Sequence, residues 1–380
     1  MTLDPQSAKK IHQQEPSETT LSPLRSTLPP LEWPGRKAVY PLLPKSEKNG
    51  FHELWTVRVV HPQKEHGLLL RFRLLNTENG FQRQILTQAL LFSRDLNREG
   101  KVTGFKGTQD LLKFNGQEMQ AIRLGDHVLD LISDSGPWST QGSLISRGKR
   151  LLWDFTFRPA DGSSASSASS WIPLKLHQGK LTRNRAVTLA ADWRAKGFCQ
   201  VDTDRWDFEE SPVEIVHEYG TQFPESWSWG HSASLAYEDG TLAPDTYFEG
   251  CTYQLRSSLG VVLPKISTFA VKYRGDIIRI DHLWGSLRSR ADSGHHHWKF
   301  QFDHGDLTFK GEFHAESRDF AGFSDEDTDG SIKQISTSLL AKLTLRIYRR
   351  AQLECTLHSV GGAALEFGTR NRNPYIRELF

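Results

Sequence analysis

Residues 68–75 read LLLRFRLL, and this stretch sets the fold class because apolar and charged side chains alternate along it. In an extended strand, successive side chains point to opposite faces. Every second side chain from Leu68 to Leu74 is apolar and shares one face, whereas Arg71 and Arg73 share the other. A period of two residues is typical of a β-strand with two different surroundings.

The same period recurs in three further segments, in which aromatic or aliphatic side chains alternate with polar ones: residues 153–158, 298–303 and 343–348. Gly, Pro, Asn and Asp separate these short segments, as they do in turns. Residues 78–96 alone have a possible helical pattern, and residues 82–92 fit a strand equally well. We therefore predict an all-β fold built from antiparallel barrels or sandwiches.

The length of 380 residues allows two domains of ordinary size. Residues 1–45 are rich in proline and polar side chains and predict a disordered N-terminal arm. Residues 161–170, DGSSASSASS, fit either a linker or a long hairpin loop. Because an apolar run resumes at Trp171, we favour the loop. We expect an N-terminal β domain over residues 46–182 and a C-terminal one over residues 183–380.

The amino-acid composition limits which partners and which compartment we expect for this protein. A net charge of +2 creates no large field that would attract nucleic acid, so we expect no nucleic-acid partner. Three widely spaced cysteines indicate neither a disulfide framework nor a zinc knuckle, and they favour a reducing compartment. Neither a signal peptide nor an apolar run of 18 residues is visible. We expect a cytoplasmic protein, with peripheral membrane contact and the oligomeric state left open.

Residues 219–240, YGTQFPESWSWGHSASLAYEDG, carry the densest aromatic signal. Trp227 and Trp229 share one face of a strand, Phe223 precedes them, and His231 follows on the same face. Two indoles and an imidazole form a π-rich wall with one titratable group, which suits a large apolar substrate or a cation formed on it. The alternative is an ordinary core strand, since aromatic residues dominate cores.

Three segments resemble known families. WDFEESPVEIVHEYGTQFPESWSWGHSASL (Trp206–Leu235) resembles the signature segment of tocopherol cyclases, which contains a Gly-x-x-Phe-Pro-x-x-Trp-x-Trp core. LTLRIYRRAQLECTLHSVGGAALEFG (Leu343–Gly368) is similar to the closing strands of that family. FHELWTVRVVHPQKEHGLLLRFRLL (Phe51–Leu75) resembles the opening of the wider carotenoid hydratase and AttH-like superfamily.

This resemblance implies two consecutive antiparallel lipocalin-like β-barrels and acid-catalysed chemistry on an isoprenoid-like molecule. One departure concerns the residues after the second tryptophan of the core. Typical family members have an amide or another polar residue there, whereas this chain has Gly230 and His231. A tocopherol substrate therefore does not transfer to this chain.

Two further groups are candidate site residues. Glu53 and Trp55 share one face of a strand; if that face points inward, Glu53 is a desolvated acid, and if it points outward, a surface glutamate. The resemblance favours the inward orientation and substrate contact. Residues 279–285 predict a second strand, with His282 and Trp284 on one face. We expect Trp284 to line one enclosed cavity of the C-terminal half together with Trp227 and Trp229.

Protonating an alkene needs a positioned acid and a surface that stabilises the cation. His231 or His282, with Asp281 or Glu218 as partner, is the expected source of that proton. Trp227, Trp229, Trp284, Phe223, Glu53 and Trp55 are the expected substrate contacts. Two functions remain open: a cofactor-independent cyclase or hydratase, and a non-catalytic carrier. The expected ligand of either is a hydrophobic small molecule, namely an isoprenoid, a quinol or a lipid.

No nucleotide-binding, hydrolase or catalytic cysteine motif occurs, so we expect no cofactor. His295, His296 and His297 have metal-ligand spacing, but they follow a Ser-Gly pair typical of a hairpin tip, and we expect no metal site. Residues 323–330 are rich in acids without the spacing of an EF-hand loop, and they predict a solvated acidic turn.

Overall fold

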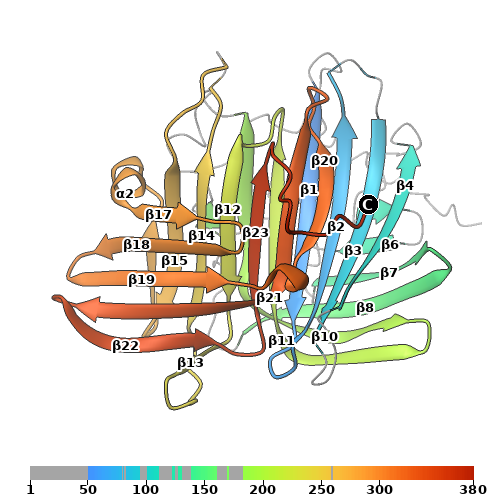
Figure 1. Ribbon diagram of the computed structural model, residues 1–380. Helices are drawn as coiled ribbons and strands as arrows, with labels where there is room; N and C mark the ends of the chain where they lie inside the picture. The colour runs from blue at the N-terminus through green and yellow to red at the C-terminus, as the bar shows by residue number, and fades with distance from the viewer. Residues whose placement is uncertain are drawn as a thin grey trace, which may run out of the picture.

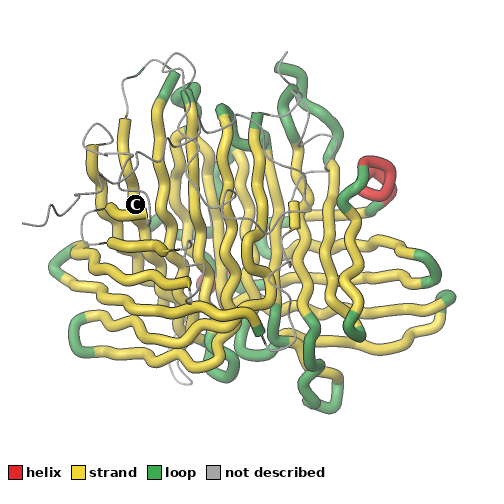
Figure 2. The backbone as a smooth tube through the Cα atoms, turned by 180° about the vertical axis from the view of Figure 1, so that it is seen from behind, coloured by secondary structure: helices red, strands yellow, loops and turns green. Residues whose placement is uncertain are grey.

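The computed structural model describes residues 50–78, 80, 83–94, 101–110, 122–124, 127–130, 138–160, 169–170, 183–257 and 260–380. The predicted arm (1–45), most of the small polar stretch (161–168) and residues 180–182 at the expected domain boundary lie outside this part. Two large antiparallel sheets make up the described part, so the all-β prediction is confirmed (Figures 1 and 2).

The first sheet comprises the strands up to residue 220. Its strands are β1 (Phe51–Val60), β2 (His66–Asn76), β3 (Arg83–Ser93), β4 (Lys101–Asp110), β5 (Ile122–Leu124), β6 (His127–Asp130), β7 (Trp138–Ser146), β8 (Lys149–Pro159), β9 (Ser169–Ser170), β10 (Asn184–Val201) and β11 (Asp204–Gly220). They lie in the order β4-β3-β2-β1-β11-β10-β8-β7-β6-β5, with β9 beside β10. Residues 82–92, which also fitted a helix, fall largely in strand β3.

The second sheet follows it in sequence. Its strands are β12 (Ser226–Ser232), β13 (Leu235–Tyr237), β14 (Tyr247–Gln254), β15 (Ile266–Tyr273), β16 (Asp276–Ile280), β17 (Arg290–Ser293), β18 (His297–His304), β19 (Leu307–His314), β20 (Ala321–Glu326), β21 (Ile332–Arg349), β22 (Gln352–Ser359) and β23 (Ala363–Thr369). The main path runs β16-β15-β14-β12-β23-β21-β19-β18-β17. Helix α2 (Leu283–Arg288) and the 3-10 turn η4 (Ser317–Asp319) are short. The chain changes sheets between Gly220 and Ser226, whereas the division expected at 182/183 falls just before β10.

Long strands with register shifts let each sheet fold around its own core. The first part of β21 pairs with β23, its last part pairs with β19 and β22, and a shift between Ser338 and Ala341 separates the two. Strand β10 is interrupted in the same way between Thr188 and Trp193. Extra residues of this kind bend a strand and increase its twist. Figure 1 shows the result as upright strands crossed by nearly horizontal ones.

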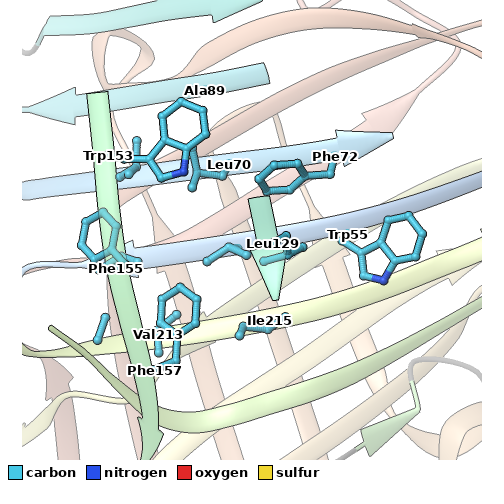
Figure 3. Close-up of a cluster of buried hydrophobic side chains, with 14 of the residues drawn as sticks. Trp55, Leu70, Phe72, Ala89, Leu129, Trp153, Phe155, Phe157, Val213 and Ile215 are labelled. Carbon is cyan, nitrogen blue, oxygen red and sulfur yellow. The ribbon is translucent and has the colours of Figure 1, made fainter. Parts of the chain in front are cut away.

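Apolar side chains form a core inside each sheet and another between the two. Figure 3 shows the core of the first sheet, where Trp153, Phe155 and Phe157 from β8 meet Leu70 and Phe72 from β2. A separate apolar cluster combines residues of both sheets, among them Leu69, Leu90, Trp229 and Leu339. Every residue of β1 is buried, because one face of β1 belongs to the first core and the other faces the second sheet.

Candidate functional site

Charged side chains are enclosed between the two sheets. Three arginines and two glutamates come from the first sheet, and three acids come from the second: Arg58, Arg71, Arg73, Glu214, Glu218, Glu249, Asp325 and Glu366. We call these eight residues the inter-sheet layer. Seven are buried, and Glu218 is partly exposed. Buried ions need partners, since an unpaired charge in a protein interior costs several kcal/mol.

Arg71 and Arg73 enter this layer because of the alternation in β2. Their apolar neighbours fill the first core, so the arginines point toward β20. An Arg71 Nη2 lies 2.5 Å from Asp325 Oδ2, and an Arg73 Nη1 lies 3.6 Å from Asp325 Oδ1. Burial alone would raise the pKa of Asp325, but the two guanidiniums lower it to about 2.

The acidic residues after Phe323 were expected to form a solvated turn, and this is wrong for two of them. Asp325 and Asp327 are buried. The Asp327 carboxylate accepts hydrogen bonds from the backbone N–H groups of Phe223 and Thr328. Asp327 thereby fixes the turn that leads into β12.

Arg58 connects acids from both sheets. Its guanidinium donates to Glu214 Oε2 at 3.0 Å and to Glu366 Oε2 at 2.9 Å. The same guanidinium lies 4.0 Å above the Trp229 ring, a cation–π contact. Trp227 Nε1 donates to the other oxygen of Glu366 at 3.1 Å. Both tryptophans of the predicted wall therefore contact this charged network.

Carboxyls outnumber guanidiniums in the layer by five to three, so protonated carboxyls are favoured there. The pKa of Glu218 is raised to about 7, mainly by burial; a hydrogen bond from Asn184 opposes the rise, and the charge of Glu366 adds to it. Burial also raises the pKa of Glu214 well above its ordinary value. Because Glu218 is partly exposed, it is the acid of the layer that solvent or a ligand reaches.

His231 lies further along β12 and is buried. Its Nε2–H donates to the Ala191 carbonyl at 2.7 Å, which leaves Nδ1 as the hydrogen-bond acceptor of the neutral ring. Burial lowers the pKa of His231, so the ring is neutral at neutral pH. A crevice of about 10 Å³ lies between His231 and Arg58, enough room for about one water molecule.

Five predicted site residues therefore come together: Glu218, Phe223, Trp227, Trp229 and His231. Phe223 stacks on His52 with ring centroids 4.0 Å apart and lies 6.2 Å from Trp227. The cavity was expected inside the C-terminal half, and that location is wrong for the two tryptophans. Trp227 and Trp229 belong to the cluster between the sheets, because Gly230, not an indole, faces Phe313 in the second core.

Glu53 and Trp55 point inward, but on the opposite face of β1. The Glu53 carboxylate bonds His217 Nε2 at 2.8 Å, and Trp55 stacks on that imidazole at 4.8 Å. Figure 3 places Trp55 at one end of the first core. This buried group lies inside the first sheet, separate from the inter-sheet layer.

Asp281, His282 and Trp284 do not join the site. Strand β16 ends at Ile280, and helix α2 begins at Leu283, so the strand predicted for residues 279–285 is wrong after Ile280. The side chain of Trp284 is 72% exposed, and His282 is exposed as well. Trp284 therefore cannot line an enclosed cavity with Trp227 and Trp229.

His297 is the first residue of β18, and His295 and His296 directly precede it. His296 Nε2 is 2.8 Å from the Ser317 hydroxyl, and the rings of His295 and His296 contact Tyr375. Within the described ranges, no group of three or more His, Cys, Asp or Glu side chains is arranged to hold a metal ion. In the same ranges, no helix has the length and apolarity needed to cross a bilayer.

Sequence reasoning missed most of the inter-sheet layer. A charged residue at every second position normally indicates a solvent-exposed face. Arg58, Arg71 and Arg73 follow that pattern although a second sheet covers them. The one available signal was the matching set of acids in β11 and β23, including Glu366, which lies within a segment already noted for its family resemblance.

Comparison with known proteins supports the fold. Neither a family model nor a curated protein matches the chain. Kievitone hydratase from Nectria haematococca superposes with a TM-score of 0.51 at 10% identity, over 87% of this chain and 94% of that one. A protein described as AttH from Nitrosomonas europaea gives 0.48 at 11% identity, over 89% and 100%. CghA gives 0.47 at 7% identity, over 87% and 93%. The likeness to kievitone hydratase shows the shared lipocalin-like fold.

Proposed function

We propose that the protein is a cofactor-independent enzyme of the hydratase or cyclase type that acts on a hydrophobic small molecule at the inter-sheet layer. The observation that carries this proposal is the partly exposed Glu218 carboxyl, which belongs to the same acid-rich layer as Glu366 and Arg58, the two residues that contact the indoles. One fold neighbour is named kievitone hydratase, which agrees with this reaction type. An isoprenoid-like substrate rests on the resemblance of residues 206–235 to tocopherol cyclases.

Glu218 is the proton donor in this mechanism. With a pKa of about 7 it holds a proton on about half of the molecules at neutral pH, and an acid near the operating pH is the most effective. The proton forms a bond to one carbon of an alkene, and the π electrons of that double bond leave a cation at the other carbon. Trp227 stabilises this cation through its ring face.

Capture of the cation completes the reaction. In a hydratase, the oxygen of a water molecule bonds to the cation and then loses one proton. In a cyclase, a second double bond or hydroxyl of the same substrate supplies the electrons. Neutral His231 accepts the released proton at Nδ1. Since Trp227 and His231 are four residues apart on one strand, they are separated by about 13 Å, which favours an elongated substrate.

Substrate binding requires the side chains between the sheets to move, because the crevice at His231 has room for about one water. Native mass spectrometry of protein purified from its own host would identify the bound molecule. The purified compound would then serve as the substrate for turnover and binding measurements.

The decisive variant is Glu218→Gln, which keeps the shape of the side chain and removes the acid. We expect turnover to fall about 10²–10⁴-fold with nearly unchanged binding of the ligand, the usual range for a general acid. Asp281→Asn is the matched control on the surface near α2, and it should leave both quantities unchanged. If Glu218→Gln turns over normally, Glu218 is not the proton donor and the proposed mechanism fails. If the bound compound is never turned over and Trp229→Ala weakens its binding, the carrier function replaces the enzymatic one.

A further inference from the structure

Glu218 is the last member of a hydrogen-bonded chain that crosses three strands. His52 in β1 and Asn184 in β10 both lie beside Gly220 of β11, one on each side. His52 Nε2 is 3.1 Å from Asn184 Oδ1, and Asn184 Nδ2 donates to Glu218 Oε1 at 2.6 Å. His52 and Asn184 are buried.

Gly220 makes this crossing possible. A side chain at position 220 would stand between His52 and Asn184 on the same face of the sheet. A Cβ there would also come within 2.1 Å of the Arg183 carbonyl oxygen. With no side chain at Gly220, the imidazole and the amide meet directly across the middle strand.

The chemistry of the Asn184 amide fixes where each proton lies in the hydrogen bonds between His52, Asn184 and Glu218. Its Oδ1 can only accept, so His52 must carry its proton on Nε2. Burial and the charge of Arg73 lower the pKa of His52 to about 3, so the ring stays neutral. Held in this orientation, Asn184 presents an N–H to Glu218. Within the described part of the chain, His52 Nδ1 has no hydrogen-bond partner.

We propose that His52 and Asn184 are positioning residues that determine which oxygen of Glu218 carries the acidic proton. An N–H that donates to Oε1 excludes a proton from that oxygen, so the acid form is protonated on Oε2. The N–H also stabilises the carboxylate left after proton transfer. This inference rests on the proposed function only in assigning the proton donor to Glu218.

Charged groups on other strands act on the same carboxyl. Glu366 on β23 and Asp325 on β20 raise the pKa of Glu218, and Arg71 on β2 lowers it. None of these replaces the hydrogen bond at Oε1, which comes from β10. A substitution at position 184 therefore separates the effect of Asn184 on the pKa of Glu218 from the effect of the charged residues in the inter-sheet layer.

The pKa of Glu218 can be measured without a substrate by carbon-13 NMR on protein labelled at glutamate carboxyls. The signal of Glu218 is the one that disappears in Glu218→Gln. We expect Asn184→Leu to raise this pKa by about 1–2 units, the effect of losing one hydrogen bond to a charged group. Asn184→Asp, which keeps the shape, should also raise it, because a second carboxyl then faces Glu218.

Substitutions at His52 test the orientation of the amide. His52→Phe should raise the pKa of Glu218, since the amide is then free to turn. His52→Gln should restore the original value, because its Nε2–H can occupy the place of the imidazole donor. Asn76→Leu, at a buried asparagine on the opposite face of the sheet, is the matched control and should leave the pKa unchanged.

An unchanged pKa in both Asn184 variants would overturn the positioning role, whatever the activity. An equal rise in His52→Phe and His52→Gln would overturn the part assigned to His52. With a substrate in hand, the pH profile of kcat should shift upward in Asn184→Leu with little change in KM. If the pKa shifts as expected and Glu218→Gln still turns over normally, the proposed function fails and the effect of Asn184 and His52 on the carboxyl stands.

Discussion

The Glu218 carboxyl couples the stability of the protein to pH. Its pKa in the folded state is about 7, above the value of about 4.3 that an unfolded chain would have. Between these two values the folded protein binds more protons than the unfolded chain. The free energy of unfolding contributed by this group therefore falls as pH rises from about 4.3 to 7, by up to roughly 4 kcal/mol.

We therefore predict that Glu218→Gln flattens the pH dependence of stability between about pH 4.5 and 7. Denaturant unfolding of the wild type and the variant at a series of pH values measures the difference. Asp325 should act with the opposite sign, because its pKa of about 2 gives stability that is lost as pH falls below about 4. Parallel curves for the wild type and Glu218→Gln would show that this carboxyl ionises normally in the folded state.

Strand β12 shows how much an element reveals through its sequence. The spacing of Trp227, Trp229 and His231 correctly placed the three side chains on one face. The spacing could not show which element packs against that face. A strand that is covered on both faces has a sequence pattern similar to that of a strand with one buried face. Arg71 and Arg73 in β2 illustrate the same limit, since their partner Asp325 belongs to a distant segment.

Short elements were harder to predict. Residues 279–285 have the alternating pattern of a strand. The strand nevertheless ends at Ile280, and helix α2 begins at Leu283. Six helical residues are too few for a periodic pattern to be recognised. The prediction of a shared aromatic cavity failed at Trp284 for this reason, whereas Trp227 and Trp229 of the longer signature segment lie in one apolar cluster between the sheets.

The two tryptophan environments make a direct comparison possible. Trp229 is fully buried under Arg58, and Trp284 is exposed. We predict that Trp229→Ala lowers the free energy of unfolding by about 3–5 kcal/mol, the usual cost of truncating a buried aromatic side chain. Trp284→Ala should change it by no more than about 0.5 kcal/mol. Chemical denaturation of both variants provides the measurement, and similar losses would contradict the assigned positions.

Across the whole molecule, the two sheets share an apolar cluster and a set of ion pairs. Leu69 and Leu90 from the first sheet pack with Leu339 and Leu340 from the second. Arg58 holds acids from both sheets at the same time. The two-unit architecture was predictable from strand patterns, but this contact was not, because pairing between distant strands leaves no local signal in a single sequence.

We predict that the two sheets unfold together in one transition. Separating them would expose the shared cluster and would take Glu366 away from Arg58 and Asp325 away from Arg71 and Arg73. Thermal unfolding followed by circular dichroism, together with hydrogen exchange of β2 and β12, would test this. Two separate transitions, or protection in one sheet after the other has lost it, would show that the sheets are independently stable.

Arg71 and Asp325 are 254 residues apart in sequence and belong to different sheets, yet they neutralise each other. Removing the Asp325 carboxylate would leave the buried Arg71 and Arg73 guanidiniums without this partner, and an uncompensated buried charge costs about 3–5 kcal/mol. We therefore expect the residues that face each other across the two sheets to change together during evolution. A chimaera that joins the first sheet of this protein to the second sheet of a diverged relative should fail to fold until position 325 and the residues facing the arginines are transplanted as well.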